Sequence, residues 1–245
     1  MRYQWNWSVF LEASPEGTQT YAGLLMSGLA WTVLTALVAW AIAFVLGSAI
    51  GVARSLPRRP ILASAAAAYV ELFRNVPLLL QLFLWYFVLP ELLPEPLAGW
   101  VKHLPYGSFW TTALGLGLYM ASRLAEQVRA GLAAVGAGQF AAARALGLGT
   151  AQIYWRVAMP QAYRIILPTL TSEFLNTIKN SSVGLGIGLL ELTARAQSIQ
   201  EYSSQVFEAF AAATILYLLL NALVTAAGRA LEKRIAIPGM EAVLR

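Results

Sequence analysis

Long apolar runs without charged residues alternate with short polar segments along this chain. Four runs contain no charge at all, namely Gly17–Ala53, Leu104–Ser122, Asn180–Leu190 and Ala209–Gly228. A fifth run, Ile61–Pro90, is interrupted only by Glu71 and Arg74. A helix crosses a bilayer core with about 20 consecutive, mostly apolar residues. The pattern therefore predicts five transmembrane helices, near residues 21–53, 61–89, 109–133, 165–190 and 208–232.

The remaining segments follow from these helices. We expect one membrane domain over residues 21–235, an N-terminal segment over residues 1–20 and a cytoplasmic tail over residues 236–245. The longest polar connection, residues 134–164, separates the third and fourth helices. The N-terminal segment contains aromatic residues that are typical of an anchor at a membrane surface, namely Trp5, Trp7 and Phe10.

Glycine spacing predicts where the helices approach one another closely. Gly47 and Gly51 form one G-x-x-x-G pattern, and Gly184 and Gly188 form another. Such patterns let two helix backbones come close together in lipid. The second pattern also lies at the outer end of the fourth predicted helix, where a gate would have to open.

The composition identifies the class of protein. Apolar residues make up 58% of the 245 residues, charged residues make up only 12%, and the mean hydropathy is +0.61. Since about 25% of the residues of a soluble domain are charged, the chain is an all-α integral membrane protein. It has no cysteine and a single histidine, His103. Thiolate and multi-histidine metal centres are therefore excluded, and no metal or cofactor is expected.

Basic residues are concentrated on one side of the predicted membrane domain. Eleven lie after the first, third and fifth helices: Arg54, Arg58, Arg59, Arg129, Arg144, Arg156, Arg164, Arg229, Lys233, Arg234 and Arg245. The other side has three, which are Arg2, Lys102 and Arg195. Because cytoplasmic segments are enriched in Lys and Arg, the N-terminus is predicted outside and the C-terminus in the cytoplasm. The basic residues form no recognisable reading module, so nucleic-acid binding is not expected.

The loop over residues 134–164 has a characteristic spacing. Ala141-Ala142-Ala143 is followed after three residues by Gly147, and Gly147 is followed after nine residues by Val157-Ala158-Met159-Pro160. This arrangement resembles the E-A-A-x3-G-x9-I-x-L-P signature of ABC importer permeases. Alanine favours a helix and glycine allows a sharp bend, so the loop is suited to dock as a rigid knob on an ATPase. An ordinary amphipathic surface helix is the alternative interpretation.

Further segments extend this resemblance from about Gly23 to Arg234. They look like the polar amino-acid branch of the ABC importer permeases, and they include Tyr69–Leu78, Ala125–Arg129, Gly138-Gln139, Pro160-Gln161-Ala162 and Glu173–Ser181. Trp5-Asn6-Trp7 and Pro90–Glu95 are most similar to permeases that import glutamate and aspartate.

The resemblance implies an ABC type-1 permease fold in the bacterial inner membrane. It also implies several partners: a cytoplasmic ABC ATPase dimer, a second permease subunit, a periplasmic amino-acid-binding protein and an amino-acid substrate, which we expect to be glutamate or aspartate. The chain lacks the ATP-binding motif G-x-x-x-x-G-K-[ST]. We therefore expect a transport subunit without catalytic residues, which contacts the ATPase through Gln139, Ala141, Ala142, Ala143, Gly147 and Pro160.

Three positions depart from the family pattern. Ala141 replaces the glutamate of the loop signature, so an ion pair with the ATPase is missing. This loss favours a heterodimer with a paralogous permease. Arg123 stands where relatives usually have tyrosine, and Asn180 where they usually have aspartate. Both changes make the membrane interior more favourable for an anion, which is consistent with an acidic substrate.

Polar residues near the middle of the predicted helices are candidates for the substrate pathway. Arg74, Arg123 and Asn180 each lie about 20 Å from one end of a predicted helix, near the membrane midplane. Ionisable residues at this depth are normally paired or functional. The complete candidate set is Arg74, Asn75, Arg123, Glu126, Lys179, Asn180, Ser181 and Ser182.

A purely structural role is the alternative for these polar residues. Glu71 and Arg74 are spaced at i, i+3, and so are Arg123 and Glu126, so each pair is able to neutralise itself on one helix. Ser181 and Ser182 are suited to bond the backbone of their own helix.

Other functions also remain open from the sequence. One alternative within the family is a permease for a polar amino acid other than glutamate or aspartate. An ion-coupled secondary transporter would use the midplane charges as its ion site, although five helices and no visible inverted repeat count against that class. A scaffolding membrane subunit would use the loop for docking alone.

Overall fold

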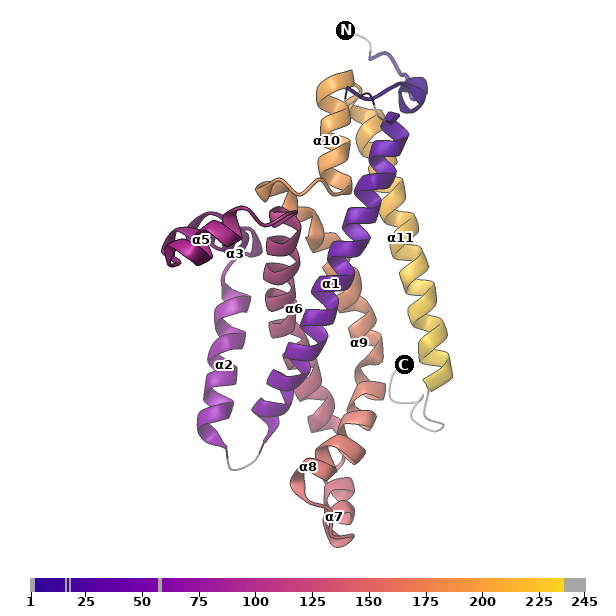
Figure 1. Cartoon of the computed structure of the whole chain (residues 1–245). Helices are drawn as coiled ribbons and strands as arrows, with labels where there is room; N and C mark the ends of the chain where they lie inside the picture. Colours follow the sequence, from indigo (N-terminus) through magenta and orange to yellow (C-terminus); the bar gives the residue numbers. More distant parts are fainter. Residues whose placement is uncertain (1–2, 16, 18, 57–58, 236–245) are drawn as a thin grey trace. The chain divides into compact units, whose positions relative to one another are not determined.

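The computed structural model describes residues 3–15, 17, 19–56 and 59–235. These residues form helices and no strand, with one isolated bridge between Ala13 and Thr20. The expected tail over residues 236–245 lies outside the described part. The α-helices in Figure 1 are α1 Tyr21–Ser55, α2 Pro60–Asn75, α3 Leu78–Phe83, α4 Leu89–Leu92, α5 Glu95–Lys102, α6 Gly107–Ala134, α7 Ala137–Ala145, α8 Thr150–Ile153, α9 Met159–Asn180, α10 Leu192–Ser203 and α11 Val206–Ile235.

Four shorter helical turns also occur among the described residues. They are η1 Trp7–Leu11 and η4 Ser181–Ile187, which are 3-10 helices, and η2 Leu84–Val88 and η3 Tyr154–Ala158, which are π-helices.

The chain divides into two compact units. Unit 1 comprises Met1–Trp40, Pro77–Gly117 and Asn176–Leu223, and unit 2 comprises Ala41–Val76, Leu118–Leu175 and Val224–Arg245. Each of the helices α1, α6, α9 and α11 supplies residues to both units.

Two helices, α1 and α11, are each long and apolar enough to cross a membrane. A third candidate span, Pro60–Leu92, is broken between Asn75 and Leu78, so the prediction of one continuous helix over residues 61–89 is wrong. The cause is Pro77, which cannot donate a helical hydrogen bond and disfavours a helical conformation in the residue before it. Val76 accordingly has an extended backbone, with ψ of 128°.

The helix predicted over residues 165–190 also differs from the structure. Helix α9 begins earlier, at Met159, ends at Asn180 and is followed by the tighter turn η4. Gly188 then adopts a left-handed conformation with φ of +81°, which ends η4. Helix α10, which follows, has no counterpart among the predicted elements.

The core of unit 1 contains the N-terminal segment. Val9 is buried among Leu24 of α1, Leu192 of α10 and Ala209 of α11. The backbone amide of Asn6 donates a hydrogen bond to Oε1 of Glu208 over 2.7 Å. The rings of Tyr3 and Trp5 also pack on Phe207, with centroid distances of 4.7 and 5.6 Å. These contacts attach the N-terminal segment to α11, and its role as a membrane-surface anchor stays a prediction.

Close helix packing at the first G-x-x-x-G pattern is confirmed in unit 2. A Cβ atom on Gly47 would lie 2.8 Å from the Leu124 side chain, and one on Gly51 would lie 2.7 Å from the backbone oxygen of Ala125. Only glycine therefore allows this approach of α1 to α6.

The second glycine pattern behaves differently. Within unit 1, added Cβ atoms on Gly184 and Gly186 would lie 2.8 Å from Thr112 and 2.7 Å from Leu79, whereas nothing lies within 4 Å of Gly188. Gly184 and Gly186 thus provide the close approach, and Gly188 provides the left-handed turn.

Candidate functional site

The segment predicted as a long connection, residues 134–164, contains a bent pair of helices and the first residues of α9, and we call it the elbow. Helix α7 ends at Ala145, and Gly147 follows with φ of +77°. The amide of Leu148 donates to the carbonyl of Ala143 over 3.1 Å, and the amide of Gly147 donates to the carbonyl of Arg144 over 2.9 Å. This pair of bonds is the Schellman arrangement that glycine favours at a helix end. The bend predicted at Gly147 is confirmed.

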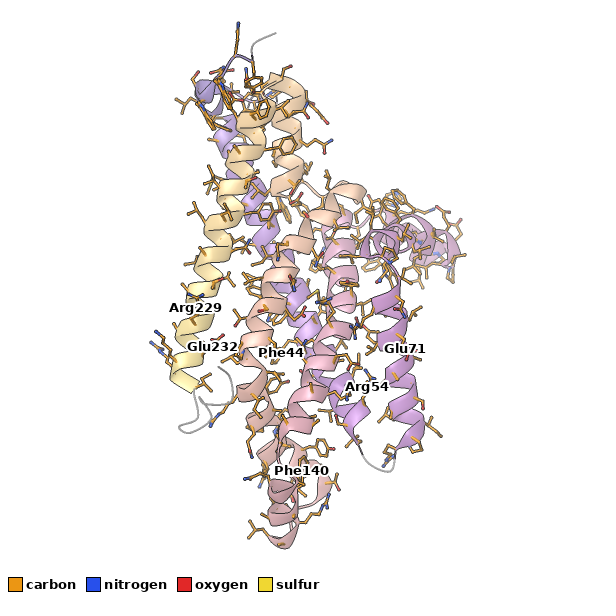
Figure 2. All side chains as sticks on the ribbon, turned by 180° about the vertical axis from the view of Figure 1, so that it is seen from behind. Phe44, Arg54, Glu71, Phe140, Arg229 and Glu232 are labelled. Carbon is orange, nitrogen blue, oxygen red and sulfur yellow. The ribbon has the colours of Figure 1, made fainter. Side chains whose placement is uncertain are left out.

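The second half of the elbow is attached to the end of α1. The hydroxyl of Tyr154 donates to the backbone oxygen of Ser55 over 2.6 Å. The ring of Tyr154 also lies edge-to-face against Phe140 of α7, with a centroid distance of 6.0 Å. Burial raises the pKa of the Tyr154 hydroxyl, so it remains a donor at neutral pH. Figure 2 labels Phe140 on the elbow and Arg54 near the end of α1.

Most residues predicted to contact the ATPase are accessible. Gln139, Ala141, Ala142, Gly147 and Pro160 are exposed, whereas Ala143 is buried at 4% exposure. Two large apolar side chains on the elbow, Leu146 and Trp155, are 81% and 78% exposed. Exposed apolar side chains of this kind are typical of a surface that another protein covers.

A charge cluster lies at the end of α1, beside the elbow. Glu126 of α6 forms ion pairs with Arg54 of α1 and, over 3.0 Å, with Arg129 of α6. Both arginines line a small cavity of about 280 Å³, together with Phe140 and Tyr154 of the elbow. The cluster therefore links α1, α6 and the elbow within unit 2.

Arg123 pairs with a residue on another helix. Its Nε and Nη2 atoms donate to the two carboxylate oxygens of Glu173 on α9, over 2.7 and 2.9 Å. Glu173 is buried, with an exposure of 6%. The alternative pairing of Arg123 with Glu126 along one helix is therefore wrong, because both residues have partners elsewhere.

The remaining candidates for the substrate pathway have different environments. Glu71, Arg74 and Asn75 of α2 are exposed, and neither Glu71 nor Arg74 takes part in the four ion pairs found among the described residues. Ser181 donates to the backbone oxygen of Ile178 over 2.7 Å. Ser182 does the same to Lys179, so the predicted bonding of these serines to their own backbone is confirmed.

The candidate residues are divided between the two units. Arg74, Asn75, Arg123 and Glu126 belong to unit 2, and the segment 179–182 belongs to unit 1. The structure places each group within its own unit. A cavity that both groups line together stays a prediction. The described part of the chain contains no group of three His, Cys, Asp or Glu residues suited to hold a metal ion.

One buried carboxylate was not singled out in the sequence. Glu191 is fully buried and caps α10, since it accepts hydrogen bonds from the amides of Thr193 and Ala194 over 2.9 and 2.8 Å. It also accepts hydrogen bonds from the hydroxyls of Tyr217 and Thr32, over 2.9 and 3.5 Å. Its place directly after the uncharged run Asn180–Leu190 was the available sequence signal.

Comparisons with known proteins give the family of this chain and its similarity to amino-acid permeases. Residues 43–237 match the family described as binding-protein-dependent transport system inner membrane component. The chain is 42% identical over 244 residues to the glutamate/aspartate import permease protein GltJ of Escherichia coli K12, with 98% of each chain covered. It is 35% identical over 212 residues to the probable glutamine ABC transporter permease protein GlnM of Bacillus subtilis, covering 86% of this chain and 93% of that one.

Solved structures have the same fold. A crystal structure of an amino acid ABC transporter with histidines superposes with a TM-score of 0.73 at 30% identity, covering 87% of this chain and 95% of that one. The MetNI methionine ABC transporter in an inward-facing conformation gives a TM-score of 0.74 at 20% identity, covering 88% and 97%. With its all-helical ABC type-1 permease fold and a family match over most of its length, this chain belongs to the inner-membrane components of binding-protein-dependent transport systems.

Proposed function

We propose that this chain imports an acidic amino acid, glutamate or aspartate, as one permease subunit of an ATP-driven transporter. As a member of its family the chain is a transport subunit and not an enzyme. In the proposed topology it crosses the bacterial inner membrane five times, with the N-terminus in the periplasm and the C-terminus in the cytoplasm. The observation that carries the proposed substrate is the 42% identity to the glutamate/aspartate permease over 98% of both chains.

The elbow is the proposed contact with the ATPase. Its apolar residue Leu146 is exposed, and Gly147 fixes its bend. Because Tyr154 bonds the end of α1 and packs on Phe140, a displacement of the elbow reaches the membrane helix directly. Hydrolysis of ATP by two cytoplasmic subunits would in this way drive the permease between its states.

Two further partners complete the proposed transporter. A periplasmic binding protein delivers the amino acid, and a second permease subunit forms the other half of the pathway. Ala141 stands in place of the glutamate of the family signature, which supports a paralogous rather than identical second subunit. Native mass spectrometry of the purified complex distinguishes the two arrangements by subunit mass.

The proposed pathway uses the charged groups of α2, α6 and α9. Arg123 holds two hydrogen bonds to Glu173 with a side chain that is still 35% exposed. A substrate carboxylate is chemically equivalent to that of Glu173, so we expect it to compete for the same guanidinium. Arg74 and Asn75 are exposed and are the proposed contacts on α2.

Uptake of radiolabelled glutamate into proteoliposomes tests the proposed function. The vesicles contain the permease pair, the ATPase and the binding protein, and ATP is supplied on the cytoplasmic side of the complex. We expect uptake with ATP and none with a non-hydrolysable analogue. Uptake driven by an ion gradient without the ATPase would favour a secondary transporter, and no uptake under either condition would favour a scaffolding subunit.

A double substitution tests the acidic substrate. Arg123→Tyr combined with Asn180→Asp restores the charge pattern of relatives, so it removes one positive charge and adds one negative charge. We expect weaker transport of glutamate and transport of neutral or basic amino acids. An unchanged preference for acidic amino acids would contradict a role of these two residues in selectivity.

Another polar amino acid is the second candidate substrate. It is favoured by the 35% identity to the probable glutamine permease and by the engagement of Arg123 with Glu173. Competition of labelled glutamate uptake by an excess of unlabelled glutamine distinguishes the candidates, since a glutamine permease would be inhibited strongly.

A further inference from the structure

A half-open groove of about 1120 Å³ lies wholly within unit 2. One wall is a single face of α1, formed by Phe44, Val45, Ser48, Ala49 and Val52, and continued by Leu56 directly after the helix. The opposite wall is a face of α8, η3 and α9, formed by Thr150, Ala151, Tyr154, Trp155, Met159 and Tyr163. Arg59 and Leu62 complete the lining. The elbow and the membrane helix α1 therefore share this groove.

The two tyrosine hydroxyls on the walls have hydrogen-bond partners within the protein itself. The hydroxyl of Tyr163 bonds Ser48 over 2.5 Å, and the ring of Tyr163 stacks on Phe44 with a centroid distance of 5.3 Å. The hydroxyl of Tyr154 bonds the backbone of Ser55. With these hydroxyls occupied, the walls present a mainly apolar surface to an occupant.

One end of the groove is positively charged. Among the described residues of the lining, Arg59 is the only charged one; it is exposed and belongs to none of their four ion pairs. An elongated apolar groove with one cation at its end fits an amphiphile with an anionic head. A free amino acid has too little apolar surface for such walls.

The length of the groove matches one leaflet of a bilayer. Phe44 and Leu56 are separated by 12 positions, which is about 18 Å along a helix, and the hydrocarbon depth of one leaflet is about 15 Å. Trp155 is 78% exposed on the opposite wall, as expected for an aromatic side chain at the membrane–water interface. In the proposed orientation this end of α1 lies at the cytoplasmic leaflet, which attracts basic side chains through its anionic lipids.

We propose that this groove binds one anionic phospholipid of the cytoplasmic leaflet, with its acyl chains along α1 between Phe44 and Leu56 and its phosphate at Arg59. The proposal rests on the orientation given under the proposed function. The bound lipid contacts α1 on one side and Trp155 of the elbow on the other, so it forms part of the connection between them.

A photoactivatable phosphatidylglycerol, with a diazirine in its acyl chain, tests the site. The permease, purified with its ATPase, is placed in phosphatidylcholine nanodiscs that contain a trace of the probe, and labelled peptides are identified by mass spectrometry. We expect labelling of the α1 face between Phe44 and Leu56, which unlabelled phosphatidylglycerol displaces and additional phosphatidylcholine does not. Equal displacement by both lipids would show ordinary annular contact and overturn the proposal.

Matched variants identify the residues that bind the lipid. Arg59→Ala should lower the apparent affinity for the probe about fivefold, the equivalent of ~1 kcal/mol for one basic residue at an anionic surface. Arg156→Ala, at an exposed position of η3 outside the lining, should leave it unchanged. Ala49→Trp should fill the groove and abolish the labelling, whereas Leu46→Trp, on α1 but outside the lining, should not.

A second crosslinking experiment distinguishes a lipid from a protein as the occupant of the groove. Benzoylphenylalanine at position 49 should form a lipid adduct in the complex. An adduct with a second permease or with the ATPase would assign the groove to that protein and overturn the proposal. Neither readout depends on glutamate uptake, so a failed transport assay and a failed lipid site are distinguishable.

Discussion

A carboxylate that is removed from water needs a charged or hydrogen-bonding partner, and Glu173 of α9 has a guanidinium that meets both of its oxygens. Arg123 supplies this guanidinium from α6 and remains partly exposed. The pair thus connects two helices of unit 2 and keeps an accessible positive group beside them. Stability and the proposed selectivity therefore both depend on Arg123.

Removal of one partner should therefore cost more than removal of both. We expect Arg123→Gln to lower the free energy of unfolding by as much as ~3 kcal/mol, because Glu173 then stays buried without its cation. Adding Glu173→Gln should recover most of this loss. Thermal unfolding of the detergent-solubilised complex measures both variants, and a double variant that is as unstable as the sum of the single ones would contradict the pairing.

The sequence identified charged residues of the candidate site more successfully than it identified the residues that pair with them. Arg123 and Glu126 were among the candidates chosen from the sequence, and both form ion pairs. The i, i+3 rule compares residues along one helix only, so it could not indicate that Glu173 of α9 and Arg54 of α1 are the partners. The contacts of Glu191 with Thr32 and Tyr217 could not be predicted, because these two residues are distant from it in sequence.

Helices α1 and α6 pack closely where glycine replaces a side chain. A Cβ atom on Gly51 would lie 2.7 Å from the Ala125 oxygen, whereas a Cβ atom on Gly99 of α5 would meet nothing within 4 Å. Gly51→Ala should therefore lower the free energy of unfolding by about 1–3 kcal/mol. Gly99→Ala, the matched control, should be neutral or stabilising by up to ~1 kcal/mol. Fluorescence-detected size-exclusion chromatography after heating measures both, and equal midpoints would refute the close packing.

The bend of the elbow depends on one left-handed residue. Gly147 has φ of +77° and no atom within 4 Å of an added Cβ, so the backbone and not space limits substitution. We expect Gly147→Val to cost about 1–2 kcal/mol at this position, to alter the bend and to uncouple ATP hydrolysis from transport.

Gly147→Asn is the control for the elbow, because asparagine tolerates the left-handed region. It should retain coupling, measured as glutamate transported per ATP hydrolysed in proteoliposomes. Normal coupling in Gly147→Val would show that the bend is not needed for contact with the ATPase.

The apolar pattern predicted the presence of the membrane helices more accurately than their continuity. α1, α6 and α11 lie close to the predicted ranges, because an uncharged run of this length has few alternatives in a bilayer. The break at Pro77 and the early end of α9 at Asn180 both lie inside stretches that were predicted as continuous helices. Hydropathy measures composition and does not detect such local changes in the backbone.

At the scale of the whole molecule, the absence of cysteine makes the proposed orientation directly testable. Trp100→Cys introduces a thiol on α5, and Lys233→Cys introduces one near the end of α11, both at exposed positions. With a membrane-impermeant maleimide, we expect the thiol at position 100 to react at the outer face of the inner membrane in spheroplasts. The thiol at position 233 should react only after the membrane is opened. Reaction of both thiols without opening would rule out the odd number of spans that the proposed topology places between positions 100 and 233.

The organisation into two units also explains which part of the site could not be predicted. Residues of the proposed pathway come from α2 and α6 in unit 2 and from the end of α9 and η4 in unit 1. Depth along a helix placed them at similar levels in the membrane. How these residues lie relative to one another within the membrane plane depends on helix packing. The hydrophobic pattern of the sequence contains no information about that packing.

Glu191 connects segments that are far apart in the sequence. A single carboxylate is bonded to a hydroxyl of α1, to the first turn of α10 and to a hydroxyl of α11. A motion that separated any two of these segments would leave the buried carboxylate of Glu191 without part of its hydrogen bonding. Spin labels on Leu29 and Leu216 should therefore keep a constant separation throughout the ATP cycle, and this part of the transporter should travel as a solid block.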